Sequence, residues 1–248
     1  VQLLIGAGVD INKQDNHGRT PLHLASEHGH VDVAHALIGA GVDINKQDNR
    51  GWTPLHLASE HGHVDVVHVL SDASTDLNKQ DNNGRTPLHS AIEKGHADVV
   101  HALIDAGADV NKRNNSKRTS LHIASEHGHV DVVRVLIDAG VDVIESHLSI
   151  AAEEKHAEVL QVLLPAFVHD TSLSPLLCAV KIHHQSAIAI LLRGGSNVNE
   201  LFPDGNSPLH VACSYDDENK AVSISEVLML HHADVNVKNK EGMTPLHL

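Results

Sequence analysis

Apolar residues recur along this chain with a period of 33 residues. A leucine inside a Thr-Pro-Leu-His tetrapeptide, or an equivalent one, marks each of the first four copies, at Leu22, Leu55, Leu88 and Leu121. Weaker copies with spacings of 27, 28, 33 and 37 residues follow at Leu148, Leu176, Leu209 and Leu246. In the seven copies long enough to test, an alanine lies three residues after the leucine. Such a period predicts a chain of similar structural units that stack on one another.

Each unit predicts two short helices, as in GRTPLHLASEHGHVDVAHALIGAGVDIN. Thr20 is a good N-cap, Pro21 is a good first helical residue, and Gly29 ends the first helix. The apolar side of that helix is formed by Leu22, Leu24 and Ala25. Val31 begins the second helix, and Gly41 ends it. The apolar stripe of the second helix is formed by Val33, Ala36, Leu37 and Ile38. Neither helix is long enough to be stable alone, so stacking must stabilise both.

The sequence TPLHLA, followed by GH, a second helix and GxDxN, resembles the ankyrin repeat. The resemblance covers essentially the whole chain, strongly to about residue 143 and more loosely after it. It implies an all-α solenoid of stacked antiparallel helix pairs, with a hairpin finger projecting from each unit. It also implies a concave surface, formed by the fingers and the first helices, on which partners dock.

The spacing predicts one continuous array over residues 1–248, with several irregular units. Its parts are a partial repeat (1–14), regular repeats (15–141), a short fingerless repeat (142–168), repeats with an inserted exposed loop near 214–223 (169–238) and a partial repeat (239–248). In the short repeat, Lys155 replaces the helix-ending glycine, and His147 replaces the proline. We expect the stack to persist there, with the concave face interrupted. Neither end carries a polar cap, which indicates a piece of a longer protein.

Composition narrows the classes of function. The chain has 32 acidic and 18 basic residues, and its net charge of −14 argues against nucleic acid as a partner. No apolar run approaches the roughly 20 residues that span a bilayer, so we expect no direct membrane insertion. Cys178 and Cys213 show no spacing typical of zinc or of a disulfide framework. We therefore expect a cytoplasmic protein that is monomeric as a fragment.

The 24 histidines raise the question of a metal site or of catalysis. Many recur after TPL or after the helix-ending glycine, and the ankyrin resemblance implies that both positions are structural. His28 and His30 could chelate a metal, but the helix break at Gly29 predicts that their rings point in different directions. No third ligand, nucleophile or carboxylate pair accompanies them, so we predict no metal, no cofactor and no enzyme. Exposed histidines would gain charge on mild acidification, but the interpretation of histidine as a polar filler in recently duplicated repeats is favoured over such a role.

The positions that differ between otherwise similar copies indicate a binding surface. The residue before each TPLH-like motif forms a predicted ladder of Arg19, Trp52, Arg85 and Arg118. The predicted fingertips carry His17, Arg50, Asn83 and Ser116. A mixed-charge track along the first helices contains Glu27, His28, Glu60, His61, Glu93, Lys94, Glu126 and His127.

Tryptophan and arginine are enriched at interface hot spots. We therefore predict that Trp52 anchors a protein or peptide segment and that the ladder arginines, which form a locally basic strip, pair with its acidic groups. In the alternative interpretation, the arginines only solubilise this face, and Trp52 lies flat on its neighbours.

These features favour a non-enzymatic scaffold or adaptor that binds a partner on its concave face. One alternative is a cytosolic regulatory or spring-like array of a larger membrane-associated protein, such as a channel or a membrane–cytoskeleton linker. Another is the repeat region of a secreted toxin. A transmembrane segment or a signal peptide in the full-length chain would separate these classes, because the fold alone does not.

Overall fold

The computed structural model describes residues 2–73, 75–169 and 172–248. It forms two compact units, Val1–Val141 and Asp142–Leu248. All regular secondary structure in the described residues is helical, which confirms the predicted all-α class. Whether the two units continue one array stays a prediction.

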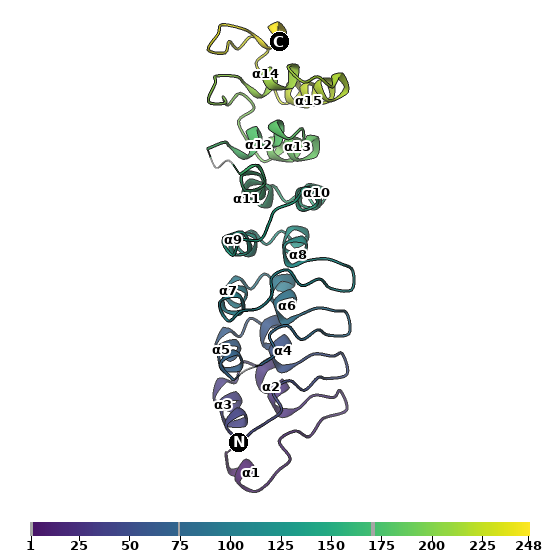
Figure 1. Cartoon of the computed structure of the whole chain (residues 1–248), viewed down its shortest axis with the longest axis vertical. Coiled ribbons are helices and arrows are strands. Elements are labelled where there is room, and N and C mark those ends of the chain that lie inside the picture. The colour runs from purple at the N-terminus through teal and green to yellow at the C-terminus, as the bar shows by residue number, and fades with distance from the viewer. Residues whose placement is uncertain (1, 74, 170–171) are drawn as a thin grey trace. The chain divides into compact units, whose positions relative to one another are not determined.

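The first unit contains one isolated helix and four helix pairs. The isolated helix is α1 (Gln2–Gly6), and the pairs are α2 (Pro21–Glu27) with α3 (Val31–Gly39), α4 (Pro54–Glu60) with α5 (Val64–Asp72), α6 (Pro87–Lys94) with α7 (Ala97–Asp105), and α8 (Ser120–His127) with α9 (Val130–Asp138). Figure 1 shows α2, α4, α6 and α8 in one row and α3, α5, α7 and α9 in a second row, with the loops projecting beside the first row. These loops are the predicted fingers.

The core of the first unit lies between the two rows of helices. The motif leucines Leu22, Leu55, Leu88 and Leu121 are all fully buried or nearly so. First helices pack on first helices, as α4 does on α2 and α6, and second helices pack on second helices, as α5 does on α3 and α7. The prediction for Leu24 was wrong, because this side chain is exposed whereas its counterpart Leu57 is buried.

The second unit contains three helix pairs and a final turn. They are α10 (Glu145–Glu153) with α11 (Ala157–Val168), α12 (Pro175–Lys181) with α13 (Gln185–Arg193), α14 (Pro208–Cys213) with α15 (Glu218–Leu230), and the 3-10 turn η1 (Pro245–His247). Here α10 packs on α13, and α11 packs on α12 as well as on α13. The first-to-first stacking of the other unit is therefore not continued from α10 to α12. Because α11 extends to Val168 and α12 begins at Pro175, few residues are left for a finger between them.

The inserted segment of the seventh repeat differs from the prediction. We expected an exposed loop near 214–223, but α15 already begins at Glu218. The Asp217 carboxylate accepts hydrogen bonds from the backbone N–H groups of Asn219 and Lys220, and so it caps the longer helix. The insertion thus adds a helical turn rather than a loop.

Several residues other than glycine adopt the left-handed backbone conformation, which glycine adopts most easily. Lys155 follows α10 with a φ of 63°, so this repeat keeps the helix break without the glycine. Lys117, at the position of the finger glycines, has a φ of 61°. His183 and His232 lie just beyond α12 and α15 and have φ values of 60° and 66°.

Candidate binding surface

The histidine of the TPLH motif caps its own helix, and in the first, second and seventh repeats its ring also contacts the backbone of the next repeat. In the second repeat, the backbone N–H of Thr53 donates to Nδ1 of His56 over 3.2 Å. The other ring nitrogen, Nε2, lies 3.1 Å from the carbonyl oxygen of Arg85. Because Nδ1 accepts a hydrogen bond, Nε2 carries the proton and donates it to that carbonyl. These contacts confirm that this position is structural.

The histidine after the helix-ending glycine connects neighbouring repeats in a second way. The Nε2 atom of His63 lies 3.0 Å from the carbonyl oxygen of Glu27, and Nε2 of His96 lies 2.9 Å from that of Glu60. This position is therefore structural as well.

The prediction about ring direction was wrong. The rings of His28 and His30 have centroids only 5.9 Å apart, because the left-handed Gly29 between them turns the chain back on itself. Still, in the part of the chain that the structure describes, no group of three His, Cys, Asp or Glu side chains is placed to hold a metal ion.

Each of the first three fingers is shaped by a carboxylate and is joined to the next finger by hydrogen bonds. One oxygen of Asp48 accepts from the backbone N–H groups of Arg50 and Trp52, each over 2.8 Å. The backbone N–H of Asn82, in the next finger, donates to the carbonyl oxygen of Arg50 over 3.1 Å. Its side-chain amide donates to the carbonyl oxygen of Asn49 over 3.1 Å. The fingers of the first unit therefore form a connected frame.

Replacing Gly51 by alanine is expected to lower the free energy of unfolding by about 3 kcal/mol, as strain and steric collision combine. Gly51 has a φ of 79°, and a Cβ there would lie 2.7 Å from the Asn82 Oδ1 and 2.9 Å from the Asn82 backbone nitrogen. Gly41 is the matched control, since its φ is 81° and an added Cβ meets nothing within 4 Å. Gly41→Ala should cost only about 1 kcal/mol of strain. Urea unfolding compares the two variants, and equal losses would contradict the close approach of the fingers.

The ladder arginines are already paired within their own repeats. In Arg19, Arg85 and Arg118 the Nη1 atom lies 3.1, 2.9 and 2.8 Å from the carboxylates of Glu27, Glu93 and Glu126, respectively. Arg19 and Arg85 also contact the carboxylates of Asp15 and Asp81 over 3.0 and 2.9 Å. The predicted basic strip was therefore wrong, because acidic side chains of the finger and of the first helix neutralise it.

Trp52 does not offer an exposed anchor, and this part of the prediction was also wrong. Its side chain is 5% exposed, and its indole N–H donates to the carboxylate of Asp81 over 3.0 Å. The ring stacks on His56, with centroids 6.2 Å apart and an angle of 26° between the planes. Trp52 thus lies flat on its neighbours, as the alternative interpretation described.

Asp81 remains a charged acceptor although it is buried. Burial raises its pKa, but hydrogen bonds from the backbone and the guanidinium of Arg85 more than offset this effect and hold the pKa below its ordinary value. The same carboxylate therefore serves the finger turn, Arg85 and the Trp52 indole.

The tryptophan changes the charge pairing of the second repeat. Without an arginine at position 52, Glu60 pairs with Lys94 of the following repeat over 3.4 Å. The Nε atom of Arg50 lies 3.3 Å from the carboxylate of Asp48. The Arg50 guanidinium also lies over the Trp52 ring, 4.1 Å from its centroid.

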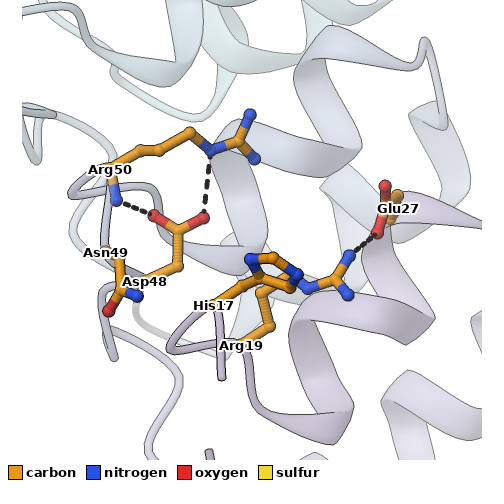
Figure 2. Close-up of a pocket in the computed structure, with 6 residues that line it drawn as sticks. All are labelled: His17, Arg19, Glu27, Asp48, Asn49 and Arg50. Atoms are coloured by element: carbon orange, nitrogen blue, oxygen red, sulfur yellow. Dashed lines mark hydrogen bonds and ion pairs between the residues drawn. The ribbon is translucent and has the colours of Figure 1, made fainter. Parts of the chain in front are cut away.

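A pocket opens between the first two fingers. Figure 2 shows its lining residues, which are His17, Arg19, Glu27, Asp48, Asn49 and Arg50. Arg50 lies on one side of the pocket, and the Arg19–Glu27 ion pair lies on the other. Sequence reasoning missed Asp48 and Asn49. The recurring Asp-Asn pair before each of the first three fingertips was the available signal.

The structure brings the other predicted residues to the same surface of the first unit. The fingertip side chains His17, Arg50, Asn83 and Ser116 are exposed. On the first helices, Glu27, Glu60, Glu93 and Glu126 are half-buried, and His28, His61, Lys94 and His127 are exposed. The surface thus combines a fixed hydrogen-bonded frame with exposed tips that differ from finger to finger.

No helix in the described ranges is both long enough and apolar enough to cross a bilayer. Neither cysteine forms a disulfide; Cys178 is buried and Cys213 is half-buried.

Comparison with known proteins identifies the repeat. A family model for ankyrin repeats matches residues 1–81, 71–146 and 148–239. A fowlpox virus ankyrin-repeat protein is 32% identical over 77 residues, which are 31% of this chain and 21% of the viral protein. The Caenorhabditis elegans ankyrin repeat and KH domain-containing protein mask-1 is 36% identical over 76 residues, which are 30% of this chain and 3% of that protein. A Rickettsia felis ankyrin-repeat protein is 32% identical over 68 residues, which are 27% of this chain and 30% of that protein.

The matched segments thus span less than a third of each relative's length. The family model, in contrast, matches nearly the whole chain, and its matches coincide with the helix pairs described above. The chain belongs to the ankyrin-repeat family.

Proposed function

We propose that this chain is a non-enzymatic adaptor that binds a protein or peptide partner on the fingers and first helices of residues 15–141. Ankyrin repeats are generally protein–protein interaction modules. The observation that carries the proposal is that side chains which hold the frame recur between fingers, whereas the exposed tips differ. Rigid elements that present varied exposed side chains suit recognition, because little entropy is lost when the partner binds.

The exposed tips offer hydrogen-bonding and charged groups rather than a hydrophobic patch. His17, Arg50, Asn83 and Ser116 make up this row, which runs over four successive fingers. A partner that follows the row would be an extended segment with polar side chains. As an adaptor of this kind, the chain would act in the cytoplasm, where the thiols of Cys178 and Cys213 stay reduced.

The test is a selection of short random peptides displayed on phage against the whole chain. A fingertip variant carries His17→Glu, Asn83→Glu and Ser116→Glu, whose side chains are exposed. A matched variant on the second helices carries His35→Glu, His68→Glu and Arg134→Ala, also at exposed positions. Each variant lowers the net charge by three units if the histidines are neutral. The two variants therefore have the same net charge, but the substitutions lie on different surfaces.

Peptides that bind the wild type and the second-helix variant, but not the fingertip variant, would support the proposal. Peptides lost only on the second-helix variant would place recognition on the opposite face and contradict it. A selection that yields no binding peptide would also count against it.

A further inference from the structure

Arg50 differs from Arg19 and Arg85 in what its guanidinium contacts. The terminal nitrogens of Arg19 and Arg85 are all engaged with carboxylates of their own repeats. Arg50 uses only Nε, which contacts Asp48. Neither of its terminal nitrogens has a partner among the described residues, and its side chain is 58% exposed.

The Arg50 guanidinium is nevertheless held in place. Its flat face lies 4.1 Å from the centroid of the Trp52 ring, where a cation is attracted to the π electrons. The Asp48 carboxylate that contacts Nε is itself fixed by two backbone N–H groups of the finger. The edge with the two terminal nitrogens remains for an outside ligand. That edge matches the two oxygens of a carboxylate, which arginine binds through two parallel hydrogen bonds.

The second finger is the only one of the four regular fingers with this arrangement. The tips of the others carry His17, Asn83 and Ser116, and the position of Trp52 is held by an arginine in the other three. Where that arginine is present, it binds the glutamate of its own first helix. The tryptophan removes this pairing from the second repeat and provides the aromatic face on which Arg50 rests.

We propose that Arg50 binds the carboxylate of an Asp or Glu side chain in an extended partner segment, and that Trp52 is a positioning residue for it. This inference rests on the proposed function. It assigns the binding of the partner's acidic group to Arg50 at one fingertip instead of to the ladder arginines. The chain's charge of −14 disfavours a polyacidic segment at long range. The partner is therefore a segment with one acidic residue among neutral ones, and its carboxylate enters the pocket beside Arg19 and Asn49.

The test uses the phage-selected peptides described above and measures their affinities for single variants. Arg50→Gln should weaken binding by about tenfold or more, as expected for an interface hot spot. Arg50→Lys should also weaken it, because an ammonium cannot form the two parallel hydrogen bonds. Arg134→Gln is the matched control, since it removes one exposed positive charge from a second helix and should leave affinity unchanged.

The positioning role of Trp52 has a separate readout. Trp52→Phe keeps an aromatic face under Arg50 and should retain the affinity, whereas Trp52→Leu keeps an apolar side chain without that face and should weaken binding severalfold. Equal affinities of these two variants would contradict the positioning role, because a merely structural residue does not separate them in this way.

The outcomes distinguish this inference from the proposed function. Peptides that share no acidic position, or that bind Arg50→Gln as tightly as wild type, would overturn the Arg50 inference. If those same peptides fail to bind the fingertip variant, the proposed function still stands. If no peptide depends on the fingertips, both are overturned.

Discussion

Replacing Trp52 by alanine is expected to lower the free energy of unfolding by about 3 kcal/mol, as is typical when a large buried aromatic side chain is truncated. The substitution removes a ring that is 5% exposed and takes the indole N–H away from Asp81. The loss should be measured by urea unfolding followed by circular dichroism, because the substitution also removes the chain's only tryptophan and its fluorescence.

Trp52→Arg provides the matched control. Arginines occupy the equivalent place in the first and third repeats, where each binds an aspartate of the finger and a glutamate of the first helix. The second repeat has both acids, Asp48 and Glu60, in the same places. We therefore expect Trp52→Arg to change the unfolding free energy by less than about 1 kcal/mol. If Trp52→Arg costs as much as Trp52→Ala, the position is not interchangeable between repeats.

The fold could be predicted because local and long-range signals agree. Thr-Pro predicts where a first helix begins, and α2, α4 and α6 begin at Pro21, Pro54 and Pro87. The left-handed glycines predict where helices end, and the 33-residue period predicts which helices stack. The seventh repeat departed from expectation because Asp217 caps a longer helix where only an acidic loop was expected.

The prediction of the site was less accurate because the repeat period does not indicate which side chains of a unit contact one another. Arg19 precedes α2 and contacts Glu27 at the end of that helix, so the two residues do not belong to one helix or strand whose spacing would pair them. Trp52 donates to Asp81, 29 residues away in the next finger. The enrichment of tryptophan at interfaces favoured an exposed Trp52. That enrichment contains no information about Asp81, which accepts the indole hydrogen bond of the buried ring.

The roles of the histidines were predicted more accurately than the binding site. The ankyrin resemblance correctly implied structural roles for the histidines after TPL and after glycine, since rings at both positions contact backbone groups of a neighbouring repeat. The ring positions of His28 and His30 were not predicted, since a left-handed glycine can bring flanking side chains together as well as separate them.

The stability of the first unit is expected to fall steeply as the pH is lowered from 7 to 5. Burial lowers the pKa of His56 and of His89 from 6.5 to about 4, and it lowers the pKa of His23 as well. Between pH 6.5 and 4, the unfolded chain binds protons that these folded rings do not bind. The stabilisation is therefore complete above pH 6.5 and is lost progressively as the pH falls toward 4. At pH 5 the loss is about 2 kcal/mol for each of the two rings with a pKa near 4.

Carboxyl groups do not produce this dependence in the same pH range. The pKa values of Asp15 and Asp81 are lowered, mainly by hydrogen bonds from Arg19 and Arg85, so both groups remain ionised there. Burial raises the pKa of Glu200, and a carboxyl of that kind favours the folded state on acidification. A loss of stability between pH 6.5 and 5 is therefore assigned to histidine.

His56→Gln separates the titration of the ring from its role as a cap. A glutamine three residues after the N-cap can accept the N–H of Thr53 in place of Nδ1, but it does not titrate. Urea unfolding at several pH values should show that His56→Gln is less stable than wild type at pH 7 and loses less stability by pH 5. The double variant with His89→Gln should lose still less. If the single variant keeps the wild-type slope, proton uptake by this ring does not control stability. In that case the acid sensitivity must come from other histidines, such as His23 or His89, since only groups that titrate in this range can produce it.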